Sequence, residues 1–413
     1  MSRLEELIKE LCPKGVPFKA LSEFGTIVRG SGLQKKDFTE TGVGCIHYGQ
    51  IYTCYGTYAY KVKTYVSPEL ADKLQKVNTG DLVIAITSEN IKDVCKCVAW
   101  LGEDSIVTGG HSAIFRHNQN PKYLAYYFQT EQFFDQKKKI ANGTKVIEVS
   151  PLKLGKVVIP LPPLPVQSEI VRILDNFAEL TAELTAELTA ELTARRSQYE
   201  FYRDALLTFS DEVPVRKFGE VATLVRGASP RPIQNFITAS DSGVNWIKIG
   251  DVRSGSKYIT STKEKITKEG ANKSRFVRKG DFVLSNSMSF GRPYIMAIDG
   301  CIHDGWLAIS NFEDHFTPDF LYHLIASNQM QKEMAKRASF GGAVQNLNAD
   351  IVRGLELPVP SLLEQKRIAT ILDRFDALCN DITSGLPAEI EARRKQYEYY
   401  RDKLLTFKEV ATA

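Results

Sequence analysis

Apolar residues recur at helical spacing through residues 170–209, where the tetrapeptide TAEL occurs three times in succession between residues 181 and 192. At about 100° per residue, these positions form one stripe about 120° wide over about forty residues. Ala, Glu and Leu are strong helix formers, and Thr is tolerated in a helix. The pattern therefore predicts one long amphipathic helix instead of a disordered spacer, with Arg195 as a charged exception on the apolar stripe.

A second copy of this block lies 198 residues further along the chain. RRSQYEFYRDALLTF (195–209) and RRKQYEYYRDKLLTF (393–407) are identical at twelve of fifteen positions. Gly385 and Pro387 predict a kink or a short interruption in the second helix. A helix of this length cannot bury its stripe against one small domain, so we expect the two stripes to pack like a coiled coil; two unrelated exposed helices are the alternative. The residues predicted to pack are Leu180, Leu184, Leu188, Leu192, Leu378, Ile382, Leu386 and Ile390.

Weaker matches extend the repeat upstream of each helical block. TIVRG (26–30) corresponds to TLVRG (223–227), and GGHSAIF (109–115) corresponds to HDGWLAI (303–309). Short β-rich runs such as DLVIAI and DFVLSN accompany helical runs such as PKYLAYYFQTEQFFDQ and PDFLYHLIASNQMQKEMA. The sequence therefore predicts an α+β chain in which two mixed α/β domains each precede a long helical block. The predicted segments are a first mixed domain at 1–158, a helical block at 159–209, a second mixed domain at 210–356 and a helical block at 357–413.

The positive charge is concentrated in the mixed domains. The first carries a net charge of +5 and the second +3, whereas the first helical block carries −4 and the second is neutral. Seven basic residues lie between Lys263 and Lys279. This distribution is compatible with a polyanion-binding surface on the mixed domains, although a solvated face is the commoner origin of such a run.

Composition indicates a soluble protein with substantial cores, since 43% of the residues are hydrophobic and 25% are charged. We expect the seven cysteines to be reduced thiols in a cytoplasmic protein. The charged N-terminus does not resemble a signal peptide, and the chain lacks an apolar run long enough to span a membrane. A metal site at Cys95, Cys97 and His111 is a weaker alternative.

Common catalytic motifs are missing from the sequence. It contains no GxxxxGK[ST], GxSxG or HExxH motif, no NPPY-type methyltransferase signature and no glycine-rich loop suited to S-adenosylmethionine. The spacings around His47, His111 and His303 do not repeat between the halves, so we interpret them as core or surface residues. A binding or scaffolding role is therefore favoured over an enzyme with an unrecognised site.

Several segments resemble the specificity subunit of type I restriction–modification systems. VRGASPRP, GVNWIKIGDV and GDFVLSNSMSFGRPYI in the second half carry this resemblance, as does the TAEL repeat followed by RRSQYEFYRDALLTF. The repeat is similar to that of the subgroup whose central helix carries a variable number of such tetrapeptides. The first half departs from the pattern, with GVGCIHYGQIY where the second half has GVNWIKIGDVR.

The resemblance implies a non-catalytic subunit of a DNA adenine methyltransferase and ATP-dependent restriction endonuclease. Each mixed domain would be a target recognition domain that reads one half of a bipartite site in double-stranded DNA. The helical blocks would pack antiparallel and dock two methyltransferase subunits, and two motor-endonuclease subunits would join them. S-adenosylmethionine, ATP and Mg²⁺ would bind the partners, so no cofactor or metal is expected in this chain. A scaffold whose two domains bind proteins or glycans is the alternative.

Candidate DNA-binding residues are those polar and basic side chains that lie in glycine-flanked loops of the mixed domains. Arg29 and Arg226 occupy the same place in the repeat, so we expect them to contact phosphate. The candidates are Arg29, Ser31, Gln34, Lys35, Lys36 and Lys145 in the first domain, and Arg226, Ser229, Arg231, Ser287, Ser289, Arg292 and Gln345 in the second.

Overall fold

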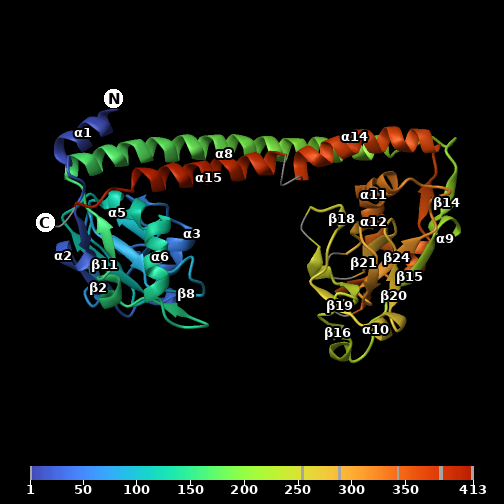
Figure 1. Cartoon of the computed structure of the whole chain (residues 1–413), viewed down its shortest axis with the longest axis horizontal. Coiled ribbons are helices and arrows are strands. Elements are labelled where there is room, and N and C mark those ends of the chain that lie inside the picture. The colour runs from blue at the N-terminus through green and yellow to red at the C-terminus, as the bar shows by residue number, and fades with distance from the viewer. Residues whose placement is uncertain (1, 253–254, 287–289, 342–343, 381–384, 411–413) are drawn as a thin grey trace. The chain divides into compact units, whose positions relative to one another are not determined.

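The computed structural model describes residues 2–252, 255–286, 290–341, 344–380 and 385–410 (Figure 1). These residues form two compact units, one of residues 1–184 with 392–413 and the other of residues 185–391. Each unit therefore contains one mixed domain together with parts of both helical blocks. In the sequence repeat, one helical block follows each domain. In the structure, each compact unit instead contains parts of both blocks.

The mixed domain of the first unit is built on two main sheets, and the larger has the strand order β2-β11-β7-β9-β4. These strands are Gly25–Arg29 (β2), Ser112–His117 (β11), Leu82–Ala85 (β7), Cys97–Trp100 (β9) and Tyr58–Ala59 (β4). The smaller sheet has the order β5-β3-β10-β6. Its strands are Thr64–Val66 (β5), Val43–Ile46 (β3), Ile106–Thr108 (β10) and Gln75–Val77 (β6).

The second unit repeats both sheets, with the orders β15-β24-β21-β22-β18 and β16-β19-β17-β23-β20. The first comprises Thr223–Arg226 (β15), Trp306–Ser310 (β24), Phe282–Ser285 (β21), Pro293–Met296 (β22) and Tyr258–Ile259 (β18). The second comprises Ile237–Thr238 (β16), Glu264–Ile266 (β19), Val244–Ile247 (β17), Gly300–Ile302 (β23) and Arg275–Val277 (β20). Arg29 pairs with Ala113 and Arg226 pairs with Leu307, so the segments matched as GGHSAIF and HDGWLAI pair with TIVRG and TLVRG at equivalent positions.

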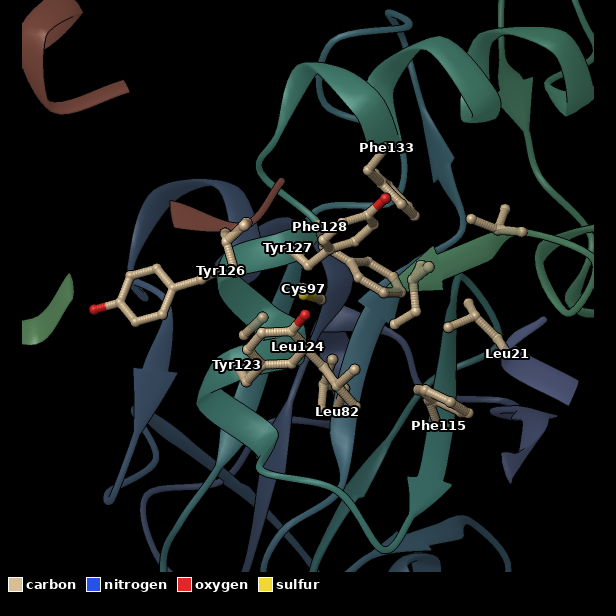
Figure 2. Packing of buried hydrophobic residues seen from close by; sticks show 14 of the residues in the cluster. Leu21, Leu82, Cys97, Phe115, Tyr123, Leu124, Tyr126, Tyr127, Phe128 and Phe133 are labelled. Carbon is tan, nitrogen blue, oxygen red and sulfur yellow. The ribbon is translucent and has the colours of Figure 1, made fainter. Parts of the chain in front are cut away.

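Each predicted helical run of the mixed domains proves to be two helices. They are Pro121–Tyr127 (α5) and Glu131–Ile140 (α6) in the first unit, and Pro318–Ala326 (α11) and Asn328–Arg337 (α12) in the second. Thr130 and Ser327 cap the second helix of each pair by accepting a backbone N–H bond, so the chain turns there. Tyr123 and Tyr127 lie among the apolar side chains of the core, whereas Tyr126 points away from them (Figure 2).

Three helices, which we call the spacer helices, make up the two helical blocks. They are Leu164–Leu206 (α8), Leu362–Asn380 (α14) and Leu386–Leu404 (α15) (Figure 1). The second block is thus two helices that flank the predicted interruption, with Pro387 near the start of α15. Within the first unit, Phe177 of α8 stacks on Tyr400 of α15 with ring centroids 5.9 Å apart. Within the second, Tyr202 of α8 stacks on Phe375 of α14 at 5.5 Å. In each unit α8 runs antiparallel to its partner helix (Figure 1), and equivalent residues exchange roles in the two contacts.

The predicted apolar stripe is covered unevenly. Leu184, Leu188 and Leu192 are half-buried, whereas Leu180 is 62% exposed. Leucines at every fourth position drift by about 40° around a helix, so one contact face cannot cover all four. Leu386 and Ile390 are half-buried and Leu378 is 38% exposed, while Ile382 lies outside the described residues. Arg195 is accommodated on the stripe by an ion pair with Glu191 at 3.4 Å.

A buried glutamine joins each spacer helix to its domain. Gln167 Oε1 accepts a hydrogen bond from the Asn120 backbone at 3.0 Å, and Gln365 Oε1 accepts one from the Thr317 backbone at 2.8 Å. Their amide groups donate to the carbonyls of Pro162 and Pro360 at the start of the helices. Both side chains are fully buried, so these bonds satisfy backbone groups that water does not reach.

Replacing Gln365 with Ala is expected to lower the free energy of unfolding by about 1–3 kcal/mol, because it leaves buried backbone groups unpaired. Thermal unfolding of the full chain measures the loss. Lys366→Ala, at the exposed neighbouring position, is the matched control. Equal melting temperatures for the two variants would contradict this role.

Candidate nucleic-acid interface

The Arg-Gly pair shared by TIVRG and TLVRG, which we call the Arg-Gly motif, holds a turn in each mixed domain. Arg29 Nε donates to the Gly110 carbonyl at 2.9 Å, and Arg226 Nε donates to the Asp304 carbonyl at 3.1 Å. The next residue, Gly30 or Gly227, lies so close to the same turn that an added Cβ would overlap the carbonyl of residue 109 or 303. We call residues 109–111 and 303–305 the clamped turns. The repeat VRG is therefore explained by a close backbone approach that requires glycine and by an arginine that ties the turn down.

In the second domain, candidate DNA-binding side chains converge on Asp304. Ser229 Oγ donates to Asp304 Oδ1 at 2.8 Å, and Arg231 forms an ion pair with Oδ2 at 3.5 Å. The hydrogen bond from Ser229 lowers the pKa of the Asp304 carboxyl, so it is ionised near neutral pH. Asn286 Nδ2 also donates to the Asp304 carbonyl at 2.8 Å. Because the Arg231 side chain remains 83% exposed, this network holds a guanidinium toward solvent.

The first domain has a different clamped turn, because Gly110 stands where Asp304 stands in the second. Here Arg29 forms an ion pair with Glu148 at 2.9 Å. His111 Nδ1 lies 2.9 Å from Thr87 Oγ1, and the Tyr48 ring lies between the rings of His111 and His47 at 4.9 and 4.5 Å. Burial lowers the pKa of His47, which favours the neutral imidazole. The two domains thus share a backbone arrangement but present different side chains on it.

A cavity of about 500 Å³ lies beside the clamped turn of the second domain. Lys248 Nζ and Glu264 Oε1 form an ion pair of 2.6 Å in its lining. Burial lowers the pKa of His303, so its imidazole is neutral near pH 7 and presents one donor and one acceptor. The lining consists of Ser229, Ile233, Gln234, Ile237, Trp246, Lys248, Glu264, His303 and Asp304.

The remaining candidates are placed less closely together. Gln34, Lys35 and Lys36 are exposed around a short 3-10 turn, and Ser31 Oγ donates to the Lys73 carbonyl at 3.4 Å. Lys145 is exposed in the loop before β12 (Ile147–Glu148), the strand that carries the partner of Arg29.

The other four candidates of the second domain are not part of the described cluster around Asp304. Arg292 lies with its guanidinium carbon 5.5 Å from the centroid of the Tyr294 ring. Ser287 and Ser289 lie outside the described residues, and Gln345 belongs to β26 (Val344–Asn346), where side chains are not described.

Residues of this surface that sequence reasoning missed include Asp304, Lys248 and His303. The match of GGHSAIF with HDGWLAI aligned His303 and Asp304 with Gly109 and Gly110. It did not show that this segment lies beside Arg226 and Gly227. Lys248 directly follows β17 and Glu264 lies in β19, and no local sequence pattern predicts their ion pair.

Cys95, Cys97 and His111 do not form a metal-ligand group in the described part of the chain. No group of three or more His, Cys, Asp or Glu side chains there is arranged to hold a metal ion. Cys95 and Cys97 are buried free thiols, and burial raises the pKa of both. No helix of the described residues is long and apolar enough to cross a bilayer.

Two mixed domains that share the backbone of the clamped turn, each attached to antiparallel helices, define a protein with two related modules. A family model described as the type I restriction modification DNA specificity domain matches residues 13–194 and again residues 210–392. The chain therefore belongs to the specificity subunits of type I restriction–modification systems, which recognise DNA sequence and are themselves non-catalytic.

Curated relatives agree with this assignment. A putative type I restriction enzyme specificity subunit of Haemophilus influenzae is 36% identical over 295 residues, which cover 70% of this chain and 72% of the relative. The EcoR124I/EcoR124II specificity subunit of Escherichia coli is 36% identical over 265 residues, or 61% of this chain and 63% of the relative.

Solved structures share the fold at low sequence identity. A chain from a type I R-M system, solved to explain complex assembly and conformational transition, has a TM-score of 0.70 at 16% identity, with 95% of this chain and 98% of that chain covered. The HsdS subunit from Thermoanaerobacter tengcongensis has a TM-score of 0.52 at 18% identity, with 96% and 97% covered. The mixed α+β fold with its internal repeat is thus confirmed.

Replacing Gly227 with Ala is expected to displace the second clamped turn, because the new methyl group overlaps the His303 carbonyl. We expect a stability loss of about 1–3 kcal/mol and faster amide hydrogen exchange at residues 303–306. Gly250→Ala is the matched control, since nothing lies within 4 Å of a Cβ there. Equal exchange in the two variants would show that the close approach does not hold the turn.

Proposed function

We propose that each mixed domain reads one half of a bipartite, asymmetric DNA target, while the spacer helices set the distance between the half-sites. The observation that carries this proposal is the clamped turn, which recurs in both domains with different side chains. A shared backbone arrangement suits two modules that bind DNA in the same manner, and different side chains suit two different half-site sequences. The net positive charge of both mixed domains supports contact with phosphates.

Within this proposal, Arg226 and Arg29 contact phosphate, and Arg231 contacts base edges. Arg226 and Arg29 share their backbone contact, so their role is common to both domains. Arg231 is held by Asp304, which the first domain lacks. A guanidinium held by a carboxylate with its far edge exposed suits bidentate contact with guanine in the major groove.

We infer that the spacer helices also dock two methyltransferase subunits, one on each unit. Phe201 is 69% exposed on α8 and its equivalent, Tyr399, is 62% exposed on α15. The neighbouring pair, Tyr202 and Tyr400, is also matched, at 41% and 40% exposed. Exposed aromatic side chains are frequent anchors of protein interfaces, and a surface that occurs twice suits two copies of one partner.

S-adenosylmethionine, ATP and Mg²⁺ would act in the partners. Adenine methylation would come from the methyltransferase subunits, and ATP-driven translocation and cleavage from two motor-endonuclease subunits. Footprinting on random DNA with the methyltransferase partner present tests the recognition role against a scaffold that binds proteins or glycans. Protection of two short blocks at a constant separation is expected, and sequence-independent protection would favour the scaffold.

Single replacements Phe201→Ala and Tyr399→Ala are each expected to weaken the binding of one methyltransferase copy by about 2 kcal/mol, the scale of an aromatic interface anchor. Stoichiometry by mass measurement of the purified complex should fall from two copies toward one for each variant, and toward none for the double variant. Leu152→Ala, at a site 78% exposed on the first domain, is the control. Two retained copies in the double variant would refute these anchors.

Removal of one TAEL repeat is expected to shorten the required half-site spacing by about one base pair. Four helical residues account for about 6 Å and a net turn of about 40°, and one base pair for about 3.4 Å and about 34–36°. A change of four residues also keeps the leucines near one face, whereas a change of two would turn the stripe by about 160°. Methylation of targets with graded spacers measures the shift. The same preferred spacer length in the two-repeat and three-repeat proteins would contradict the prediction.

A further inference from the structure

An aspartate of the spacer helices binds the domain in the first unit. Asp175 of α8 accepts a hydrogen bond from the Tyr126 hydroxyl at Oδ1, at 2.7 Å. Its Oδ2 forms an ion pair with Lys122 Nζ at 2.9 Å. Tyr126 and Lys122 lie one turn apart on α5. Because each occupies a different carboxylate oxygen, the pair resists rotation of α5 about this point. Figure 2 shows the Tyr126 ring leaving the domain core, as this contact requires.

The equivalent aspartate, Asp373 of α14, binds the domain of the second unit. Lys257 Nζ and His323 Nε2 both reach Asp373 Oδ1, at 2.6 and 2.7 Å. His323 is fully buried, and its Nδ1 lies 3.1 Å from the Tyr199 hydroxyl of α8. Since the carboxylate accepts, Nε2 carries the proton and Nδ1 accepts from Tyr199. One imidazole therefore connects α11 with two spacer helices.

The charged partners are held in their ionised forms. Burial disfavours the charge of Lys257, but its bonds to Asp319 and Asp373 outweigh this and raise its pKa. Burial likewise opposes ionisation of Asp373, but His323 and Lys257 outweigh it and lower its pKa. Partly buried charge-assisted hydrogen bonds of this kind are short and directional.

A second aspartate pair acts on the following helix of each domain. Asp402 of α15 accepts from the Glu131 backbone N–H at 3.1 Å, at the start of α6. Asp204 of α8 accepts from the Asn328 backbone N–H at 3.3 Å, at the start of α12, and from the Asn328 side chain at 2.9 Å. Asp204 and Asp402 are 198 residues apart, as are Asp175 and Asp373. Each domain is thus held at two points, by carboxylates from two different spacer helices.

We propose that Asp175 and Asp373, assisted by Asp402 and Asp204, are positioning residues that fix the orientation of each recognition domain on the spacer helices. Their effect is to set how strictly the complex discriminates between half-site spacings. This inference rests on the proposed function. One base pair turns the second half-site by about 34–36°, so rejection of a wrong spacing requires that each domain cannot turn by that angle on its helices.

Loss of the contacts of Asp175 is therefore expected to weaken the discrimination between spacer lengths without changing the half-site sequences that are recognised. Tyr126→Phe removes one hydrogen bond with little change of shape, and Asp175→Asn removes the charge. The complete complex with its methyltransferase partner is assayed on targets whose spacer is native, one base pair shorter or one base pair longer. We expect the ratio of methylation rates, native over altered spacer, to fall about tenfold for Asp175→Asn, the scale of one charge-assisted hydrogen bond. A smaller fall is expected for Tyr126→Phe.

Controls separate positioning from simple stabilisation. Glu183→Gln neutralises an exposed carboxylate on the same helix and should leave the ratio unchanged. Asp175→Asn combined with Lys122→Met should lower the native-over-altered spacer ratio by less than the two single effects combined, because both changes remove the same ion pair. If Asp175→Asn does not yield folded protein, the spacer ratio of Tyr126→Phe alone tests the inference.

Two results would overturn the inference. One is an unchanged spacer ratio in folded Tyr126→Phe and Asp175→Asn complexes. The other is a changed base preference within a half-site, which would place Asp175 in recognition and not in positioning. If the unmodified complex itself showed no spacer preference, the proposed function would fail instead.

Discussion

The antiparallel register of the spacer helices within each unit is the constraint on which the other features depend. It places the end of one helical block beside the beginning of the other, so Phe177 meets Tyr400 and Phe375 meets Tyr202. Residues 198 apart in sequence consequently occupy equivalent surroundings, one in each unit. That exchange explains why RRSQYEFYRDALLTF and RRKQYEYYRDKLLTF match at twelve of fifteen positions, since equivalent residues meet equivalent surroundings in the two units.

Much of this architecture is predictable from local sequence. The periodicity of the TAEL segment predicted α8, and Gly385 with Pro387 predicted the break between α14 and α15. The match of TIVRG with TLVRG identified Arg29 and Arg226 as equivalent residues, and the structure gives them equivalent backbone contacts. The exposure of Leu180 was not predictable, because the helical wheel shows which residues share a face but not how much of that face a partner covers.

Contacts between distant segments could not be predicted in the same way. Ser229 and Asp304 lie 75 residues apart, and Tyr199 and His323 lie 124 apart. Such pairs depend on the register of the sheets and on how the helices cross the domains. Neither feature can be read from the local pattern of a single sequence. The sequence therefore predicted only candidate loops for the interface, and these stay predictions, while the contacts of Asp304 and the cavity residues are seen only in the fold.

Duplication of a clamped turn in two domains attached to helices is the arrangement from which we infer recognition of two different sequences at a set separation. Sequencing of methylated adenines in a cell that carries this chain with its methyltransferase partner tests that account most directly. We predict one asymmetric motif made of two short specified blocks with a constant unspecified gap. A continuous motif, a palindrome or methylation without sequence preference would contradict it.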